Sequence, residues 1–208
     1  AYSAAMATYG SGKPDLRFND GRTDPAGRFW VGTVNTAKSA QDAALYRVDP
    51  DGTNAFIEGD MLTCNGAAFN ADGTAFRHAD TPSHALRAYD ADPATGALSR
   101  RRILHQFQMG KGRPDGGSFD AEGCYWSALF DGGRVVRLSP EGDILQTVVL
   151  PTSRPTMIAF GGPDLRTAYV TTATAGLSDA DLAAQPHAGA IFSFPVDIPG
   201  VPEFAFAG

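Results

Sequence analysis

Short hydrophobic or alternating runs recur along the whole chain, and turn-forming pairs such as Asp72-Gly73 and Gly132-Gly133 separate them at close intervals. Glycine (24 residues) and proline (14 residues) are both frequent. Short runs bounded by such turns are typical of antiparallel strands joined in hairpins. The pattern therefore predicts an all-β protein.

The runs expected to form strands share this alternation and cover residues 29–34, 44–48, 66–70, 75–79, 86–89, 102–107, 117–120, 124–129, 134–138, 144–150, 157–160, 168–172 and 190–194. One segment has a helical pattern instead. Residues 178–185 are expected to form a short helix with Ser178 as its N-cap.

The chain also repeats itself at its turns. Gly27, Gly73 and Gly123 occupy equivalent turns separated by 46 and 50 residues, and a looser fourth copy runs from Thr156 to Val170. A period of this length that carries about four strands is the signature of a β-propeller blade. We therefore expect residues 1–208 to form a single β-propeller domain that supplies about four blades.

Each repeat places a polar side chain five positions before the residue that opens its turn. These side chains are Asn19, Asn65 and Asp115, and Thr156 is the equivalent in the fourth copy. The innermost strand of a propeller blade lines the central channel, so equivalent side chains at its start converge on one axis. Amide and carboxylate oxygens suit hard divalent cations such as Ca²⁺, Mg²⁺ and Mn²⁺. The repeat predicts a cation site at one end of the channel.

Asp115 is the only acid of the three. It is therefore the candidate metal ligand that could also accept a proton from an attacking water in metal-assisted hydrolysis. A structural alternative stays open, because Asn and Asp before Gly are also common turn formers that satisfy local backbone donors.

Composition and charge narrow the class of protein. With 208 residues, 43% of them hydrophobic, the chain is long enough to bury a substantial core as one domain. The net charge is −6 and no basic cluster is denser than Arg100-Arg101-Arg102, which argues against a nucleic-acid partner. We expect this triplet to be a solvated strand edge. No apolar run approaches the ~18 residues of a membrane helix, so no membrane partner is expected.

Other residue types with catalytic potential lack the required spacing. Cys64 and Cys124 lie in separate repeats without C-x-x-C spacing, which argues against a zinc site or a disulfide framework and is compatible with a cytoplasmic location. Ser118 and Ser127 lack the setting of a hydrolase nucleophile. The four histidines show neither metal nor triad spacing: His78, His84, His105 and His187.

Large aromatic residues recur at fixed places in the repeat, and we expect them to be buried between blades. The set is Trp30, Trp126, Phe29, Phe69, Phe119, Tyr125 and Phe160. Because a buried indole N–H needs an acceptor, both tryptophans are expected to have a hydrogen-bond partner.

Several segments together resemble the SMP-30/gluconolactonase/regucalcin-like family, and the likeness extends over residues 16–208. The matching motifs are Arg17-Phe18-Asn19-Asp20-Gly21, Asp24-Pro25-Ala26-Gly27-Arg28-Phe29-Trp30-Val31-Gly32-Thr33, Tyr89-Asp90-Ala91-Asp92-Pro93-Ala94-Thr95-Gly96, Arg113-Pro114-Asp115-Gly116, Gly132-Gly133-Arg134-Val135, Phe160-Gly161-Gly162 and Phe204-Ala205-Phe206-Ala207-Gly208.

The resemblance implies a six-bladed propeller that holds one divalent cation, whether Ca, Zn, Mn, Mg or Fe, and hydrolyses sugar lactones such as aldonolactones. It implies that Asn65 and Asp115 are metal ligands, with Asp115 also the catalytic acid/base. It further implies that Arg17 and Asn19 contact the substrate. A planar guanidinium suits that role, because it can hold several oxygens of a polyhydroxy ligand.

The chain departs from the family pattern at its beginning. By this resemblance a further metal ligand is expected, a glutamate in the first blade of family members, and the sequence contains no match to that blade. The resemblance therefore implies that the N-terminal blades are missing. Three hypotheses stay open: a gluconolactonase-type enzyme, a non-catalytic calcium-binding or regulatory propeller, and an inactive truncated propeller fragment. A second departure lies at Phe76-Arg77-His78-Ala79-Asp80-Thr81, where the family has an aromatic and apolar strand. Two interpretations of Arg77 and His78 stay open, drift or a local surface difference.

Overall fold

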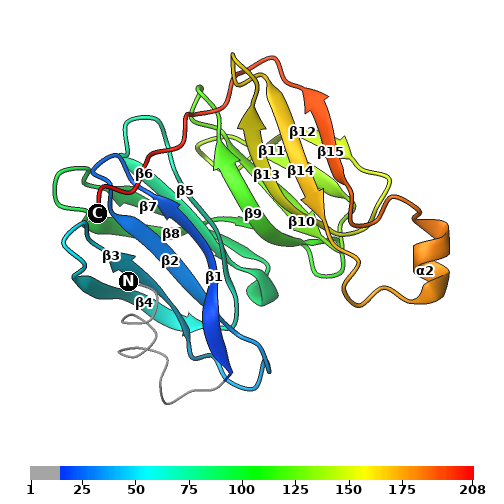
Figure 1. Ribbon diagram of the computed structural model, residues 1–208, viewed down its shortest axis with the longest axis horizontal. Helices are drawn as coiled ribbons and strands as arrows, with labels where there is room; N and C mark the ends of the chain where they lie inside the picture. Colours follow the sequence, from blue (N-terminus) through cyan, green and yellow to red (C-terminus); the bar gives the residue numbers. More distant parts are fainter. Residues whose placement is uncertain (1–14) are drawn as a thin grey trace.

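The computed structural model describes residues 15–208, and the chain folds there into four small antiparallel sheets arranged as propeller blades (Figure 1). The first 14 residues of the expected domain lie outside the described part. The expected all-β fold with four blades is confirmed. No helix in residues 15–208 is long and apolar enough to cross a membrane.

Each blade runs from an inner to an outer strand in chain order. The first contains β1 (Leu16–Thr23), β2 (Phe29–Asn35), β3 (Ala43–Val48) and β4 (Asn54–Met61), and the second contains β5 (Cys64–Phe69), β6 (Ala75–Asp80), β7 (Ala85–Ala91) and β8 (Leu98–Gln106). The third contains β9 (Arg113–Phe119), β10 (Tyr125–Phe130), β11 (Arg134–Leu138) and β12 (Ile144–Val149). The fourth has three strands, β13 (Pro155–Gly161), β14 (Thr167–Thr172) and β15 (Ile191–Pro195).

Two short helical segments interrupt the blades. The 3₁₀ turn η1 (Thr81–Ser83) joins β6 to β7, and α2 (Asp179–Ala184) lies between β14 and β15 at the edge of the molecule (Figure 1). The helix expected over 178–185 is confirmed. Ser178 and Asp181 form a capping box, in which each side chain accepts a hydrogen bond from the other residue's backbone N–H.

The expected strands are confirmed with shifts at their ends, but the pattern missed two elements. Neither β1 nor β4 was among the expected strands. β1 is half-buried and mainly polar, and β4 is a partly exposed outer strand, so neither shows a clean alternation of apolar and polar residues. The inner strands β5, β9 and β13 also begin two, four and two residues earlier than the expected runs.

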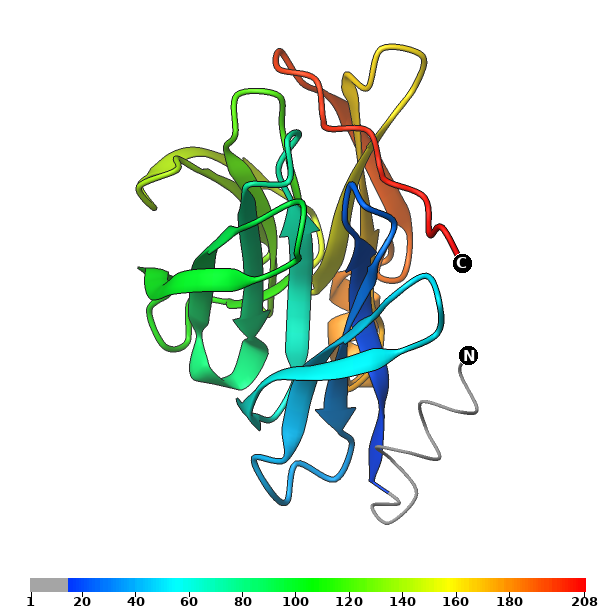
Figure 2. The same ribbon diagram turned by 90° about the vertical axis from the view of Figure 1, so that its left-hand side faces the viewer.

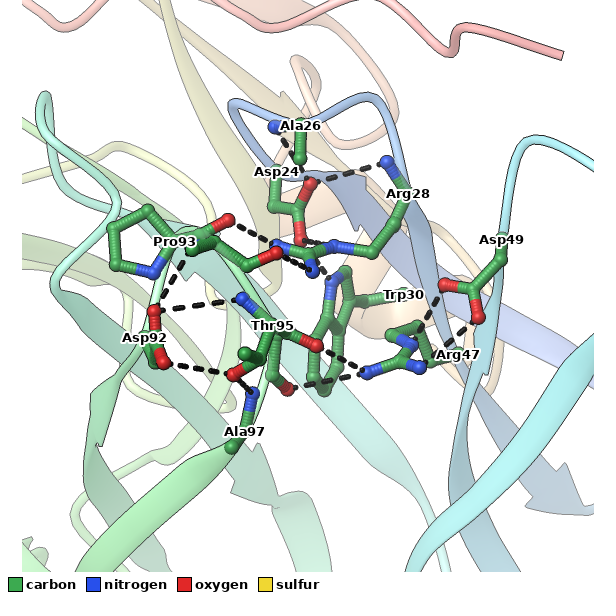
Figure 3. Close-up of polar contacts among 12 residues, drawn as sticks. Asp24, Ala26, Arg28, Trp30, Arg47, Asp49, Asp92, Pro93, Thr95 and Ala97 are labelled. Atoms are coloured by element: carbon green, nitrogen blue, oxygen red, sulfur yellow. Dashed lines mark hydrogen bonds and ion pairs between the residues drawn. The ribbon is translucent and has the colours of Figure 1, made fainter.

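An aspartate closes the first turn of two blades and explains the spacing of the repeat. Asp24 Oδ1 accepts hydrogen bonds from the backbone N–H groups of Ala26 and Arg28, and its Oδ2 accepts one from Trp30 Nε1 at 2.9 Å (Figure 3). In the third blade Asp120 Oδ2 accepts from Trp126 Nε1 at the same distance of 2.9 Å. Both tryptophans therefore have the expected partner.

The second blade lacks this pair and has Asn70 and Phe76 at the equivalent positions. Asn70 Oδ1 still accepts from the backbone N–H of Ala75 and closes the turn at 2.9 Å. A phenylalanine has no indole N–H, so no second acceptor oxygen is needed there. The acidic side chain thus occurs in the blades whose tryptophan requires it.

Apolar side chains fill the spaces between blades. Trp30 packs against Phe69 and Phe76 between the first two blades, and Trp126 packs near Ile158 between the last two. Of the expected aromatic set, all are buried except Phe29 and Phe160, which are half-buried. The interpretation of residues 76–78 as a local surface difference is wrong, because Phe76, Arg77 and His78 are all buried.

The C-terminal segment, residues 196–208, leaves β15 and crosses the ends of the blades (Figure 2). Val201 N–H donates to Phe119 O in the third blade, and Ala207 N–H donates to Gly27 O in the first, both at 3.1 Å. This C-terminal strap joins blades that are not neighbours in the sequence.

Candidate metal and substrate site on the inner strands

Every inner strand is irregular at its predicted site residue. The pairing of β1 with β2 shifts between Phe18 and Gly21, and that of β5 with β6 shifts between Asn65 and Ala68. The pairings of β9 and β13 shift around Asp115 and Thr156 in the same way. A bulge places an extra residue on one strand and re-aims its side chain. The repeat thus presents four equivalent bulges on the inner strands.

A glycine after the site residue lets the neighbouring blade approach. A Cβ atom on Gly66 would lie 2.8 Å from Asp115 O, and one on Gly116 would lie 2.7 Å from Thr156 O. Both distances are shorter than real Cβ contacts, so only glycine fits. These close contacts confirm that equivalent positions of the second, third and fourth blades are neighbours.

The first blade carries Asp20 where the next two carry glycine. Its Oδ1 accepts from the backbone N–H of Gly21 at 2.8 Å, and its Oδ2 accepts from that of Ala67 at 3.2 Å. Burial raises the pKa of the Asp20 carboxyl, against the lowering effects of Arg22 and these backbone donors. The carboxylate therefore joins the first blade to the second.

One chain of hydrogen bonds connects the predicted substrate and metal residues. Arg17 donates to Asn19 Oδ1 at 3.3 Å, and Asn19 Nδ2 donates to Asn65 Oδ1 at 2.5 Å. Asn65 Nδ2 then donates to Thr81 Oγ1 at 2.8 Å, and Thr81 Oγ1 donates to Pro114 O at 2.7 Å, one residue before Asp115. The structure thus brings Arg17, Asn19 and Asn65 together, with Asp115 on the adjoining strand.

The carboxyl group of Asp115 is an unusually weak acid. Burial raises the pKa of its carboxyl to about 7, and the negative charge of Asp20 adds to this effect. Arg113 and Lys38 lower the pKa but do not offset the burial. The positive side chains of residues 15–208 therefore do not offset the cost of burying the Asp115 carboxylate. A nearby cation would stabilise the ionised form.

The donor set fits a hard divalent cation. Asp115 offers a carboxylate oxygen and Asn65 an amide oxygen, which keeps a second lone pair beyond its bond to Asn19. Residues 15–208 contain no cluster of three or more His, Cys, Asp or Glu side chains. Such a cation would need further oxygen ligands, because Ca²⁺ takes six to eight.

Sequence reasoning missed Asp20 and Thr81. Asp20 is part of the motif that begins at Arg17. It occupies a repeat position where the second and third blades have glycine, and this difference could have marked it as a functional candidate. No repeat equivalence marked Thr81, which lies in η1 and orients the Asn65 amide. The fourth equivalent, Thr156, bonds to Thr171 Oγ1 at 2.8 Å.

The serines and cysteines rejected as nucleophiles are buried in the fold. Ser118 Oγ donates to Ile158 O at 3.0 Å in the neighbouring blade, and Ser127 is fully buried. Cys64 and Cys124 are both unpaired and buried, and burial raises the pKa of each thiol. A thiol that stays protonated is a poor nucleophile.

The fold is that of a β-propeller whose described part supplies four blades. Its inner strands are bulged and bring the amide oxygen of Asn65 and the carboxylate of Asp115 onto adjoining strands. The chain matches the SMP-30/Gluconolactonase/LRE-like region over residues 2–174. It belongs to this family. The expected resemblance is therefore confirmed.

Similar proteins carry lactonase and regucalcin names. The chain is 46% identical over 204 residues to the 6-deoxy-6-sulfogluconolactonase of Pseudomonas putida, covering 98% of this chain and 70% of that protein. It is 40% identical to regucalcin of Danio rerio, with 94% of this chain and 68% of that protein covered.

The structural likeness is close but partial. A calcium-binding protein, regucalcin from Agrobacterium tumefaciens, superimposes with a TM-score of 0.89 at 30% identity. The match covers 94% of this chain and 66% of that one. The chain thus spans somewhat less than two thirds to about 70% of the proteins it resembles.

Proposed function

We propose that this chain carries the substrate site and part of the metal site of a divalent-cation-dependent sugar lactonase of the gluconolactonase type. The hydrogen-bond chain from Arg17 through Asn19 and Asn65 to Thr81 carries the proposal, because it orients amide oxygens beside Asp115. Relatives named as lactonases support the reaction class. The substrate would be a sugar lactone and the product the open aldonic acid.

In this proposal Asn65 and Asp115 hold the cation. When bound there, a divalent cation supplies Lewis-acid polarisation of the lactone carbonyl and makes water more acidic. Asp115 accepts the proton of the attacking water, and its pKa of about 7 in the cation-free protein shows how strongly its position disfavours an isolated charge. Thr81 fixes the Asn65 amide, so its oxygen keeps one orientation.

Arg17 and Asn19 orient the substrate. The Arg17 side chain is held by Phe18 O and Asn19 Oδ1, which leaves other guanidinium donors for sugar hydroxyls. The lactone carbonyl must face the attacking water for the reaction to occur. Contacts that hold the sugar in this orientation therefore increase the rate. The substitution Arg17→Ala should raise KM more than it lowers kcat.

Substituting Asp115→Asn tests the assignment. The amide keeps the shape and removes the base, so aldonolactone turnover should fall ~10²–10⁴-fold at saturating cation. Turnover is followed by acid release, with Asp72→Asn in an exposed turn as the control. A parent-like rate for Asp115→Asn would show that the base lies elsewhere.

A second candidate function is non-catalytic calcium binding. The relatives named regucalcin and calcium-binding protein favour it. Calcium titration with and without lactone turnover separates the two functions, since a binding protein would show affinity alone. Comparing this chain with a longer form that contains the two remaining blades would test the third hypothesis, an inactive fragment.

We also propose a cytoplasmic location. Within residues 15–208 the two cysteines are unpaired and lie in different blades, which suits a reducing compartment. Measuring free thiols in protein isolated without reductant would test this.

A further inference from the structure

A second ring of equivalent positions lies two residues before each site residue. These positions hold Arg17, Thr63, Arg113 and Arg154. Arg17 donates to Asn19 Oδ1 at 3.3 Å, and the charge of Arg113 acts on Asp115, so both side chains lie close to a site residue. Three of the four positions are arginines.

The fourth position acquires its cation from another segment. Thr63 Oγ1 accepts a hydrogen bond from Lys38 Nζ, although Lys38 comes from the loop between β2 and β3. Thr63 lies two residues before Asn65 and is itself held by Asp80, whose Oδ1 accepts from its backbone N–H at 3.0 Å. All four positions therefore have a positive charge beside them, although the first blade supplies two of these charges, Arg17 and Lys38. We call Arg17, Lys38, Arg113 and Arg154 the cationic rim.

Two members of the rim share one carboxylate. Arg113 and Arg154 both form ion pairs with Asp131, and both guanidinium groups lie over the Phe130 ring, at 5.0 and 5.3 Å from its centroid. This shared carboxylate and ring fix the two side chains in place. They provide a positive background on the third and fourth blades.

The other two members have no acidic partner within residues 15–208. Arg17 donates only to oxygens of Phe18 and Asn19, and Lys38 donates to the neutral hydroxyl of Thr63. Both residues are exposed, so a ligand can reach them. Elsewhere on the blades, Arg28 is paired with Asp24 and Arg87 with Glu58.

The charges of the rim act on one another and on the site. Packing of the Lys38 amine lowers its pKa, Asp80 and Asp115 oppose this shift, and Arg17 and Arg113 add to it. Lys38 therefore lies within electrostatic reach of Asp115 and of two further cations. An anion bound between Arg17 and Lys38 would offset this repulsion.

We propose that the cationic rim selects sugar lactones that carry an acidic substituent, a sulfonate, phosphate or carboxylate, and that Lys38 is the residue that binds this group. The inference rests on the proposed function, which places the lactone ring against Asn19, Asn65 and Asp115. A neutral aldonolactone would leave Lys38 without a charged partner. An acidic substituent remote from the carbonyl would extend from the ring to the rim.

The test compares gluconolactone with gluconolactone 6-phosphate in the cation-loaded protein. The parent should prefer the phosphorylated lactone in kcat/KM. The variant Lys38→Met keeps the apolar stem and should lose ~5- to 20-fold more kcat/KM on the phosphorylated lactone than on the neutral one, with the difference arising in KM. Lys38→Arg should restore the preference, and 0.5 M salt should weaken it.

Arg100→Met serves as the charge-matched control. Arg100 lies on the outer strand β8, where its side chain is 80% exposed and pairs with Asp90. It removes one positive charge far from the inner strands, so the preference should be unchanged. If Lys38→Met and Arg100→Met have equal effects, the preference follows net charge and the proposal is wrong.

A binding measurement separates this inference from the proposed function. D-glucitol 6-phosphate and D-glucitol cannot be hydrolysed, and calorimetry with each reports recognition of the acidic group alone. Tighter binding of the phosphate that Lys38→Met abolishes supports the rim even if no lactone is turned over. Equal binding of both polyols, or equal kcat/KM for both lactones, overturns the inference and leaves lactone hydrolysis untouched.

Discussion

At the scale of single residues, Asn65 differs from Asp115 in what its loss should change. Asn65 contributes an amide oxygen and no proton-accepting group, so Asn65→Ala should weaken cation binding and leave the base intact. Turnover of the variant should fall at low cation and recover substantially as cation is added. Titrating activity with Ca²⁺ or Mn²⁺ measures this, and a loss that no cation concentration restores would contradict the role of a ligand.

The repeat predicted that Asn19, Asn65 and Asp115 lie close together, because they occupy equivalent positions. Asn19 donates to Asn65, Asp115 lies on the adjoining strand, and Arg17, which only the family resemblance indicated, donates to Asn19. Lys38 and Thr81 could not be found this way. Both lie in connecting segments outside the repeat, and only the fold brings them to the inner strands.

At the scale of elements, the first turn of a blade depends on one carboxylate. Asp24 accepts from two backbone N–H groups, the Trp30 indole and the Arg28 guanidinium, and it is 1% exposed. Asp24→Ala would leave these buried donors unpaired, which typically costs ~3–5 kcal/mol when a buried ion pair is broken. Urea unfolding should show this loss.

The control for this turn is Asp72→Ala. Asp72 accepts hydrogen bonds from Thr74 in an exposed turn of the second blade, so its loss should cost about 1 kcal/mol or less. Similar losses for Asp24→Ala and Asp72→Ala would contradict the role assigned to Asp24.

The contact between β4 and β7 should respond to acid. Burial alone would raise the pKa of Glu58, but hydrogen bonds from His78 and Tyr89 and the charge of Arg87 lower it from 4.5 to about 2. Because the folded pKa is depressed, the unfolded chain binds more protons in this window. The contribution of Glu58 is therefore complete above about pH 5 and is lost as the pH falls toward 2, by at most about 3 kcal/mol.

The neighbouring histidine acts in the same direction. Burial lowers the pKa of His78, although Glu58 opposes this, so the unfolded chain gains a proton first below pH 6.5. Glu58→Gln should flatten the fall in stability between pH 5 and 2, as measured by urea midpoints across pH. Glu122→Gln, an exposed carboxylate paired with Arg137, is the control. An unchanged acid limb in Glu58→Gln would contradict the pKa.

Element prediction failed at β4 for a physical reason. An outer strand is half exposed, so its apolar side chains need not alternate. Its position is determined by contacts with other strands. Glu58 pairs with Arg87 from the neighbouring blade and with Arg101, contacts that no local pattern encodes. The Arg100–Arg102 triplet was expected to be a solvated strand edge, and all three residues are exposed, although Arg101 also pairs with Glu58 of the neighbouring blade.

At the scale of the whole molecule, the C-terminal strap holds blades together from one end. Glu203 pairs with Arg22 at 2.6 Å, and Arg22 also donates to Ala67 O and Gly117 O on the next two inner strands. One guanidinium therefore connects three blades and the strap. The closing sequence motif is thus a structural element, which the resemblance alone did not reveal.

Gly200 offers the sharpest test of the strap, because the backbone there passes directly over an aromatic ring. A Cβ atom would lie 2.2 Å from Phe160 Cγ, so Gly200→Ala must displace the strap or the ring. Overpacking of this kind costs ~1–3 kcal/mol, and if the strap detaches, the contacts of Val201 and Glu203 are lost with it. The melting temperature should fall, and amide exchange should increase at Val201 and Ala207 while the core of β10 stays protected.

Ala205→Ser is the matched control for the strap, since Ala205 is exposed and its side chain can accept a hydroxyl without displacing its neighbours. Glu203→Gln should lower stability less than Gly200→Ala, because it removes one charge while the backbone bonds remain. If Gly200→Ala melts like the parent and exchange at Ala207 is unchanged, the strap does not hold the blades. The blades would then rest on their inter-blade cores and on Arg28 and Arg47, which reach the carbonyl oxygens of the turn between β7 and β8 (Figure 3).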